Sequence, residues 1–320
     1  MISIYNKKPY ILVAFLLLAT TLAMAKENKA FTFTPTTGII SGKVREYVFS
    51  EYINSEERML SRLDWQQYIV PFIGATETIK YHDSFFRLSI VSAIPIRCGR
   101  LKDFDFLNET PTVLTHYSQH DLYLDKCFIF SANVGYTFYA RTFILAPSLG
   151  IKTKSQKWSA YNGYIQYAAE KEPIEGNPTI HEAWTEDVEK FEISGNGISY
   201  EQQCLLPFVS LMGGYEISSD WSVFVDLKLF PYLIIDTLDS HYLTPSRQFF
   251  DSMKGGSGFE INAKALYNKS AIVIGYEYLS VFNGTSYVGS IGLGSGVVGP
   301  TTAKPGTDSS LVKIAFEYSY

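Results

Sequence analysis

Long apolar runs are nearly absent from this 320-residue chain. Beyond residue 25 it has no stretch of about 18 consecutive apolar residues, the length that predicts a membrane-spanning helix. The formal net charge is -5, so no surplus of positive charge favours a nucleic-acid partner. We therefore expect neither transmembrane helices nor nucleic-acid binding.

Cysteine is scarce as well. Cys98, Cys127 and Cys204 are the only three, so at most one disulfide can form within the chain, and no Cys-x-x-Cys metal motif occurs. Counted along extended strands, Cys98 and Cys127 fall on opposite faces, which predicts free thiols. We expect neither a metal nor an organic cofactor; a cation held by carboxylate oxygens alone is the alternative.

The apolar residues that are consecutive lie at the N-terminus. Lys7 and Lys8 precede the run ILVAFLLLATTLAMA at 11–25, which ends in a small-x-small triplet. A basic start, an apolar core shorter than the ~20 residues of a spanning helix, and a small-residue cleavage site are typical of a secretory signal peptide. We expect residues 1–25 to be removed and 26–320 to form one exported domain; an uncleaved anchor is the alternative.

The rest of the chain alternates with a period of two and is rich in aromatics, with 23 Tyr and 22 Phe. In LVKIAFEYSY (311–320), apolar and aromatic residues occupy every second position. This pattern predicts β-strands, and a soluble sandwich also shows it. Long strands, aromatic strand ends and two kinds of connection favour an outer-membrane barrel instead. The short turns lie at 81–83, 139–140, 218–220 and 268–269, and the long polar stretches near 99–121, 158–197, 237–253 and 287–308.

The fold class predicted is all-β: a ten-stranded antiparallel transmembrane β-barrel with long extracellular loops. An even number of strands allows closure, which leaves no unpaired backbone edge in lipid. The strands are expected at 40–50, 58–73, 84–99, 121–138, 141–157, 197–216, 220–236, 254–267, 270–287 and 309–320. So narrow a lumen should be filled by side chains. Candidates are Arg62, Asp64, Gln66, Arg87, Ser131, Asn133, Asp226, Lys228, Glu260 and Lys264.

Two acidic motifs lie in the predicted outer loops. Asp103 and Asp105 in LKDFDFLN, and Asp239 and His241 in LDSHY, are each separated by one residue. In extended backbone this spacing puts both side chains of a pair on one face. An Asp can orient a His that takes a proton from water, and opposing carboxylates can hold that water or, if one is protonated, stabilise an oxyanion. Ordinary turns also contain these motifs, so a solvated-loop reading stays open.

Several segments resemble the omptin family of outer-membrane proteases in order and spacing. They are FTFTP (31–35), SGKVREYVF (41–49), SRLDWQ (61–66), LKDFDFLN (101–108), YEQQCLLPFVSLMGGYE (200–216) and LDSHY (238–242). The resemblance spans nearly all of the mature chain. It implies a monomeric ten-stranded barrel in the outer membrane with an outward-facing endopeptidase site for extracellular peptides or proteins. It also implies that Asp103, Asp105, Asp239 and His241 are the catalytic residues.

The resemblance extends to residues beside the catalytic ones. Ser118 and His120 match a Ser and a His of the family, which implies that they line the site; a solvated loop is the alternative for His120 and for His116. Glu46 matches a glutamate with which omptins bind a basic side chain beside the scissile bond. Its acidic companion, expected two positions before Asp239, is Thr237 here. Asp236 has the opposite parity, so the preference for basic residues is left open.

The lipid-binding pattern of the family departs further. Omptins engage lipopolysaccharide through residues whose positions are filled here by Ile151, Thr153, Ser155 and Gln203, so the resemblance implies that this pattern is lost. Three lysines lie in the same segment, and we interpret them as part of a wet loop rim rather than as a headgroup site. They are Lys152, Lys154 and Lys157.

One pattern argues against a catalytic site. Counted by twos along the seventh strand, Asp239 and His241 share parity with Val223, which belongs to the lipid-facing side. Pro231 is a natural place for an irregularity that reverses the faces, because proline within a strand occurs at edges or bulges. We predict such an irregularity, since the protease interpretation fails without it. The alternative function is a non-catalytic surface barrel that acts as an adhesin or a structural protein.

Overall fold

β-Strands form most of the chain. A computed structural model describes residues 29–51, 57–108, 113–171, 180–243, 246–290 and 297–320. The signal peptide expected at 1–25 lies outside these residues, so it remains a prediction. No helix in the described ranges is long and apolar enough to cross a membrane.

The strands of the first half of the chain are β1 (Lys29–Glu51), β2 (Glu57–Tyr81), β3 (Ser84–Ala93), β4 (Ile96–Asp105), β5 (His116–Tyr136), β6 (Phe138–Ala140), β7 (Phe143–Tyr167) and β8 (Phe191–Glu192). Those of the second half are β9 (Asn196–Glu216), β10 (Trp221–Phe230), β11 (Leu233–His241), β12 (Arg247–Gly255), β13 (Ser257–Tyr267), β14 (Ser270–Val281), β15 (Thr285–Gly289), β16 (Val297–Pro300) and β17 (Ala303–Tyr318).

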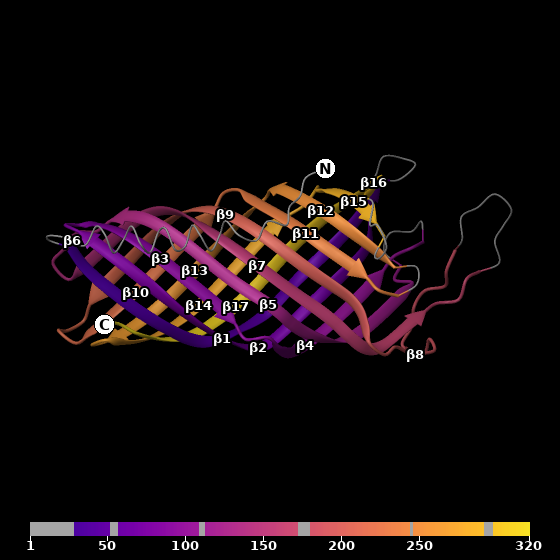
Figure 1. Ribbon diagram of the computed structural model, residues 1–320, viewed down its shortest axis with the longest axis horizontal. Helices are drawn as coiled ribbons and strands as arrows, with labels where there is room; N and C mark the ends of the chain where they lie inside the picture. The colour runs from indigo at the N-terminus through magenta and orange to yellow at the C-terminus, as the bar shows by residue number, and fades with distance from the viewer. Residues whose placement is uncertain (1–28, 52–56, 109–112, 172–179, 244–245, 291–296) are drawn as a thin grey trace.

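These strands close into one antiparallel ring, in which β1 pairs with both β2 and β17. Five ring positions consist of two successive strands each: β3–β4, β10–β11, β12–β13, β14–β15 and β16–β17. The other five positions are those of β1, β2, β5, β7 and β9; the short strands β6 and β8, which pair with β7, belong to the positions of β5 and β9. Together the described strands fill ten positions, which confirms the predicted barrel. Figure 1 shows the strands running obliquely around a long cylinder, as closure requires.

The two ends of the cylinder differ. At one end, β2 and β3 are joined at His82 and Asp83, and β13 and β14 at Asn268 and Lys269, as predicted. Near 139–140 the turn is one or two residues later than predicted, because β6 continues to Ala140.

At the other end the strands are longer than predicted. The expected loop at 99–121 is mostly strand, since β4 continues to Asp105 and β5 begins at His116. The alternation of apolar residues stops where the strand leaves the lipid, while backbone pairing continues, and so composition misplaced the boundary.

An apolar belt covers the outer surface of the barrel toward the end with the short turns. On β9 the outward side chains of Leu205, Val209, Leu211 and Tyr215 are exposed, and the next outward residue is the polar Gln203. Ile234 pairs with Leu205, and Asp239 pairs with Tyr200. Asp239 is therefore five residues past the belt on β11, roughly 16 Å beyond it at the usual rise per residue. The end of the barrel that carries Asp239 extends outside the lipid.

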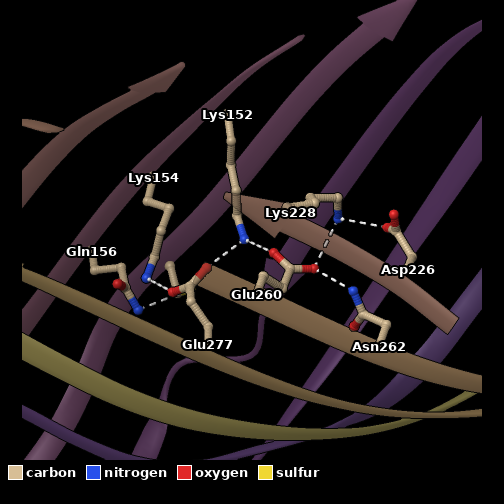
Figure 2. A network of polar contacts seen from close by, with 9 residues as sticks. Lys152, Lys154, Gln156, Asp226, Lys228, Glu260, Asn262 and Glu277 are labelled. Atoms are coloured by element: carbon tan, nitrogen blue, oxygen red, sulfur yellow. Dashed lines mark hydrogen bonds and ion pairs between the residues drawn. The ribbon is translucent and has the colours of Figure 1, made fainter. Parts of the chain in front are cut away.

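Side chains fill the lumen in two layers. Trp65, Trp158 and Tyr200 are fully buried beside Asp239, whose cross-strand partner is Tyr200, and the rings of Trp65 and Tyr200 stack with centroids 5.4 Å apart. Deeper in the barrel lies a network of charges (Figure 2). Lys152 Nζ lies 2.6 Å from Glu260, and Lys154 Nζ lies 2.6 Å from Glu277. The prediction that these two lysines belong to a wet rim is therefore wrong, because both are buried inside the barrel.

Three of the ten predicted lumen residues face outward, so that part of the prediction is wrong. Ile69 has a positive φ of 49°, and the register of β1 and β2 shifts there, which reverses the faces of β2. Leu63, Trp65 and Gln67 consequently point inward. Their neighbours Arg62, Asp64 and Gln66 turn outward, where Asp64 pairs with Arg45 and Arg62 and Gln66 accepts a hydrogen bond from the exposed Tyr68.

The irregularity predicted at Pro231 is present. In β10, Leu229 pairs with Val209 of β9, whereas in β11 Ile234 pairs with Leu205. Five residues on one strand therefore match four on the other. Leu229 is 47% exposed, while Leu233, of the same parity, is 0% exposed. The one-residue bulge turns the odd-numbered residues of β11 into the lumen.

All three cysteines are free and buried. The prediction of free thiols is confirmed, but its reason was wrong, because Cys98 and Cys127 both belong to the buried core of the barrel. A register shift of β4 against β5 between Arg97 and Gly99 turns Cys98 inward.

Candidate active site

The Asp239 and His241 side chains meet at the inner face of β11. His241 Nε2 lies 2.6 Å from Asp239 Oδ2, a distance at which the imidazole N–H donates to the carboxylate. Asp239 is 5% exposed and His241 is 36% exposed at the side chain. With Nε2 held by Asp239, Nδ1 is the ring nitrogen left to exchange a proton with the cleft. Phe249 of β12 packs edge-on against the imidazole.

The carboxylate pair lies on β4, on another wall of the ring. Asp105 pairs across the sheet with Ser61, and Asp103 pairs with Leu63 of the same strand. Ser61 Oγ donates a hydrogen bond of 3.3 Å to Asp103 Oδ1. Asp103 and Asp105 therefore occupy a strand, not the loop in which the sequence placed them, and their positions are fixed by backbone pairing.

Charge links the two walls. Burial alone would lower the pKa of His241, but Asp239 above all, and then Asp103 and Asp105, raise it to about 9. Burial and the adjacent Asp105 raise the pKa of Asp103 well above its ordinary value, although His241 opposes this. Burial likewise raises the pKa of Asp105. The raised pKa values of His241, Asp103 and Asp105 favour a cationic imidazole that faces a carboxylate pair sharing a proton.

β5 supplies a second layer of side chains beside the aspartates. Ser118 pairs with Asp103, and His116 pairs with Asp105. His120 Nε2 lies 3.0 Å from Ser118 Oγ, and its Nδ1 lies 2.6 Å from the carbonyl oxygen of Asn162. These histidines are buried, so the solvated-loop reading is wrong. His116 and His120 are four residues apart, but in a strand this separates them by roughly 13 Å, so they form no ligand pair.

A cleft of about 580 Å³ opens between the two walls. His241 and Asp105 both line it, together with residues that sequence reasoning did not single out. These are Leu107, Tyr167, Arg247 and Phe249, and His116 joins them. They come from strand ends whose inward parity could be assigned only after the register shifts were known. The volume of the cleft lies within the range of about 300–1,000 Å³ that is typical of ligand-binding pockets.

A further acidic group lies next to Asp239. Glu46 of β1 is 3% exposed, Thr237 of β11 is 7% exposed and Asp251 of β12 is 7% exposed. Thr237 and Asp251 are directly opposite in the ladder, and Thr237 Oγ1 donates to Asp251 Oδ2 at 3.3 Å. Burial raises the pKa of Asp251 to about 6, and the charge of Asp239 adds to this. Asp251 was absent from the residues predicted from the sequence, because only strand pairing brings it beside Thr237.

Solved structures of outer-membrane proteins resemble this barrel. The crystal structure of the outer membrane protease OmpT from Escherichia coli superposes with a TM-score of 0.73 at 16% identity, covering 91% of this chain and 96% of that one. The outer membrane protein OprG from Pseudomonas aeruginosa gives a TM-score of 0.38 at 10% identity, covering 92% and 97%. At 16% sequence identity, the similarity to OmpT shows that the fold is shared. Comparison with curated proteins gave no match.

Comparison with protein families gives a match over most of the sequence. The model of the Omptin family matches residues 27–295, which include β1 to β15 and both walls of the candidate site. The matched stretch contains the acidic pair on β4 and the Asp–His pair on β11 in the order that the resemblance in sequence implied. This chain is an outer-membrane β-barrel that belongs to the omptin family.

Proposed function

We propose that this protein is an endopeptidase that hydrolyses extracellular peptides or proteins with a water molecule activated by Asp239 and His241. The observation that supports the proposal most directly is the 2.6 Å contact between His241 and Asp239 on the wall of a cleft that Asp105 also lines. Burying an Asp–His pair together with two more carboxylates costs free energy, and such clusters of groups with shifted pKa values are typical of functional sites.

The residues divide the reaction between them. Neutral His241 takes a proton from water at Nδ1 while the water oxygen attacks the scissile carbonyl carbon. Asp239 stabilises the imidazolium that forms. The protonated member of the Asp103 and Asp105 pair donates a hydrogen bond to the developing oxyanion, and the ionised member holds the water. The intermediate collapses when His241 returns the proton to the leaving nitrogen, so neither a covalent enzyme intermediate nor a metal is required.

The test is peptide cleavage by the refolded full-length barrel. His241→Ala and Asp103→Ala should each lower kcat by about 10²- to 10⁴-fold, the usual contribution of a general base or acid. Asp236→Asn is the matched control, because Asp236 lies on the same strand but is exposed. Circular dichroism should show an intact barrel in each variant. Equal activity of wild type and His241→Ala would overturn the proposal.

We also propose that the site faces the outside of the cell. The turns at 82–83, 141–142 and 268–269 are short, as periplasmic turns are, and the catalytic end is the opposite one. Intact cells should therefore cleave a membrane-impermeant fluorogenic peptide, and His241→Ala cells should not. If no peptide in a broad library is cleaved, with or without added lipid, the adhesin or structural alternative is favoured.

A further inference from the structure

Arg247 lines the cleft, and the proposed mechanism does not use it. Of the seven described residues around the cleft, it alone carries a permanent positive charge. The ion pairs among the described residues do not include Arg247. A guanidinium that lines a cleft and is bound to none of the described carboxylates can bind a carboxylate of a ligand.

Backbone pairing fixes the place of Arg247. It is the first residue of β12 and lies directly opposite His241 in the ladder with β11, so the Cβ atoms of the two residues are about 5 Å apart. Its parity is that of Phe249, which lines the cleft, and of Met253, which is 1% exposed. Arg247 itself is exposed. Its side chain therefore leaves the inner face of the barrel at the level of His241, on the open side of the cleft.

Arg247 adjoins the reacting groups without belonging to them. Burial lowers the pKa of His241, and Asp239 and then the carboxylate pair raise it; Arg247 is not among these causes. The proposed mechanism also places the developing oxyanion at the carboxylate pair, on another wall of the cleft. An extended peptide advances about 3.3–3.6 Å per residue, so a group bound by Arg247 belongs to a residue within about two positions of the scissile bond.

We propose that Arg247 is a specificity-determining residue that binds a carboxylate of the substrate close to the scissile bond. The inference rests on the proposed peptidase function, because it places the substrate beside His241. Two parallel N–H groups of a guanidinium can donate to the two oxygens of one carboxylate. Without this cation, the carboxylates of Asp105 and Asp239 would repel an acidic residue from the cleft. The bound carboxylate can belong to an acidic side chain or to the C-terminus of the substrate.

The first test uses peptides that differ only in Glu against its neutral isostere Gln, placed in turn at the two positions on either side of the scissile bond. Wild type should prefer Glu at one of them. Arg247→Gln should lower the Glu-to-Gln ratio of kcat/KM there by about 10- to 100-fold, the usual effect of losing one charge-assisted hydrogen bond. Arg247→Lys, which keeps the charge but not the planar fork, should give an intermediate ratio.

Arg100→Gln is the matched control. Arg100 is exposed on β4, and its neighbour Leu101 is 0% exposed, so Arg100 faces away from the cleft. Its removal should leave the Glu-to-Gln ratio at the wild-type value. The ratio compares two substrates of one preparation, so a variant that folds in low yield still gives a valid result.

A second pair of peptides, with a free or an amidated C-terminus near the scissile bond, distinguishes the two sources of the carboxylate. A preference for the free terminus that Arg247→Gln removes assigns the bound group to the C-terminus, whereas a Glu preference that it removes assigns the group to a side chain. Equal rates for charged and neutral peptides in both pairs, or preferences that Arg247→Gln leaves unchanged, overturn the inference.

Two further measurements separate the subsite from the peptidase. Arg247→Glu should reverse the preference, so that Lys replaces Glu as the favoured residue at the same position. Binding of the same peptides to His241→Ala, measured by calorimetry, should weaken for the charged member when Arg247→Gln is added. Binding that depends on Arg247 in a wild type that cleaves nothing supports the subsite and overturns the peptidase. Cleavage by wild type that ignores the charge of the peptide supports the peptidase and overturns the subsite.

Discussion

At the scale of single residues, the protonation state of His241 sets the pH range in which the proposed site is active. Only the neutral imidazole can accept a proton from water, and the surrounding carboxylates raise the pKa of His241 to about 9. In the free enzyme kcat/KM should therefore rise with pH up to about 9. Asp239→Asn removes the largest cause that raises this pKa, so the ascending limb should move to lower pH while the maximum rate falls.

The measurement is a pH profile of kcat/KM for one peptide between pH 5 and pH 10. Asp236→Asn again serves as the control, since its exposed carboxylate is not among the causes of the His241 shift. A limb that stays at the same pH in Asp239→Asn would contradict the assignment of His241 as the base.

At the scale of elements, the bulge between β10 and β11 is what points the Asp–His pair into the cleft. Deleting Tyr232 should remove the extra residue and let Ile234 to His241 continue the phase of β10. A one-residue slip moves every side chain to the other face. Asp239 and His241 would then point away from the cleft, and cleavage should fall to the level of His241→Ala.

Pro231→Ala provides the control for that deletion, because it keeps the residue count and hence the bulge. It should retain most of the activity. Both variants are compared by peptide turnover after circular dichroism has shown an intact barrel. Full activity in the deletion variant would mean that the bulge is not what orients the pair.

Strands themselves could be predicted from the sequence, whereas the faces of some strands could not. Alternation and tight turns give strand number and order, since both are local properties. A bulge reverses the faces of all residues that follow it in the strand. In the sequence, only Pro231 indicated such a bulge. Ile69 carries no such signal, because a β-branched residue is a poor candidate for positive φ. Arg62, Asp64 and Gln66 were assigned to the lumen for that reason.

The same limit applies to the site. Asp103, Asp105, Asp239 and His241 could be proposed from two short motifs, because each pair is local in sequence. Asp251 could not, because its place depends on the register between β11 and β12. When only the pairing of strands brings two residues together, their spacing along the sequence does not indicate that they are neighbours.

At the scale of the whole molecule, the charges of the lumen are separated from the site. Along β7, Lys152 and Lys154 come before Trp158, whose ring stacks on Tyr200, the cross-strand partner of Asp239. Figure 2 shows Lys152 between Glu260 and Glu277, with Lys154 on Glu277 and Lys228 on Glu260. This arrangement neutralises each buried charge and holds strands from different parts of the ring together. We therefore expect it to act on stability and not on catalysis.

Lys154 gives the sharpest test, because Glu277 is the one described carboxylate with which it forms an ion pair. Glu277→Gln should strand that buried ammonium and lower the free energy of unfolding by about 3–5 kcal/mol. Adding Lys154→Met should recover most of the loss, since Lys152 keeps Glu260. Glu317→Gln is the control: its partner Lys264 is 28% exposed, so the change should stay below about 1 kcal/mol. Urea unfolding of the refolded barrel measures all three, and a double variant no more stable than Glu277→Gln would show that the stranded lysine is not the cause.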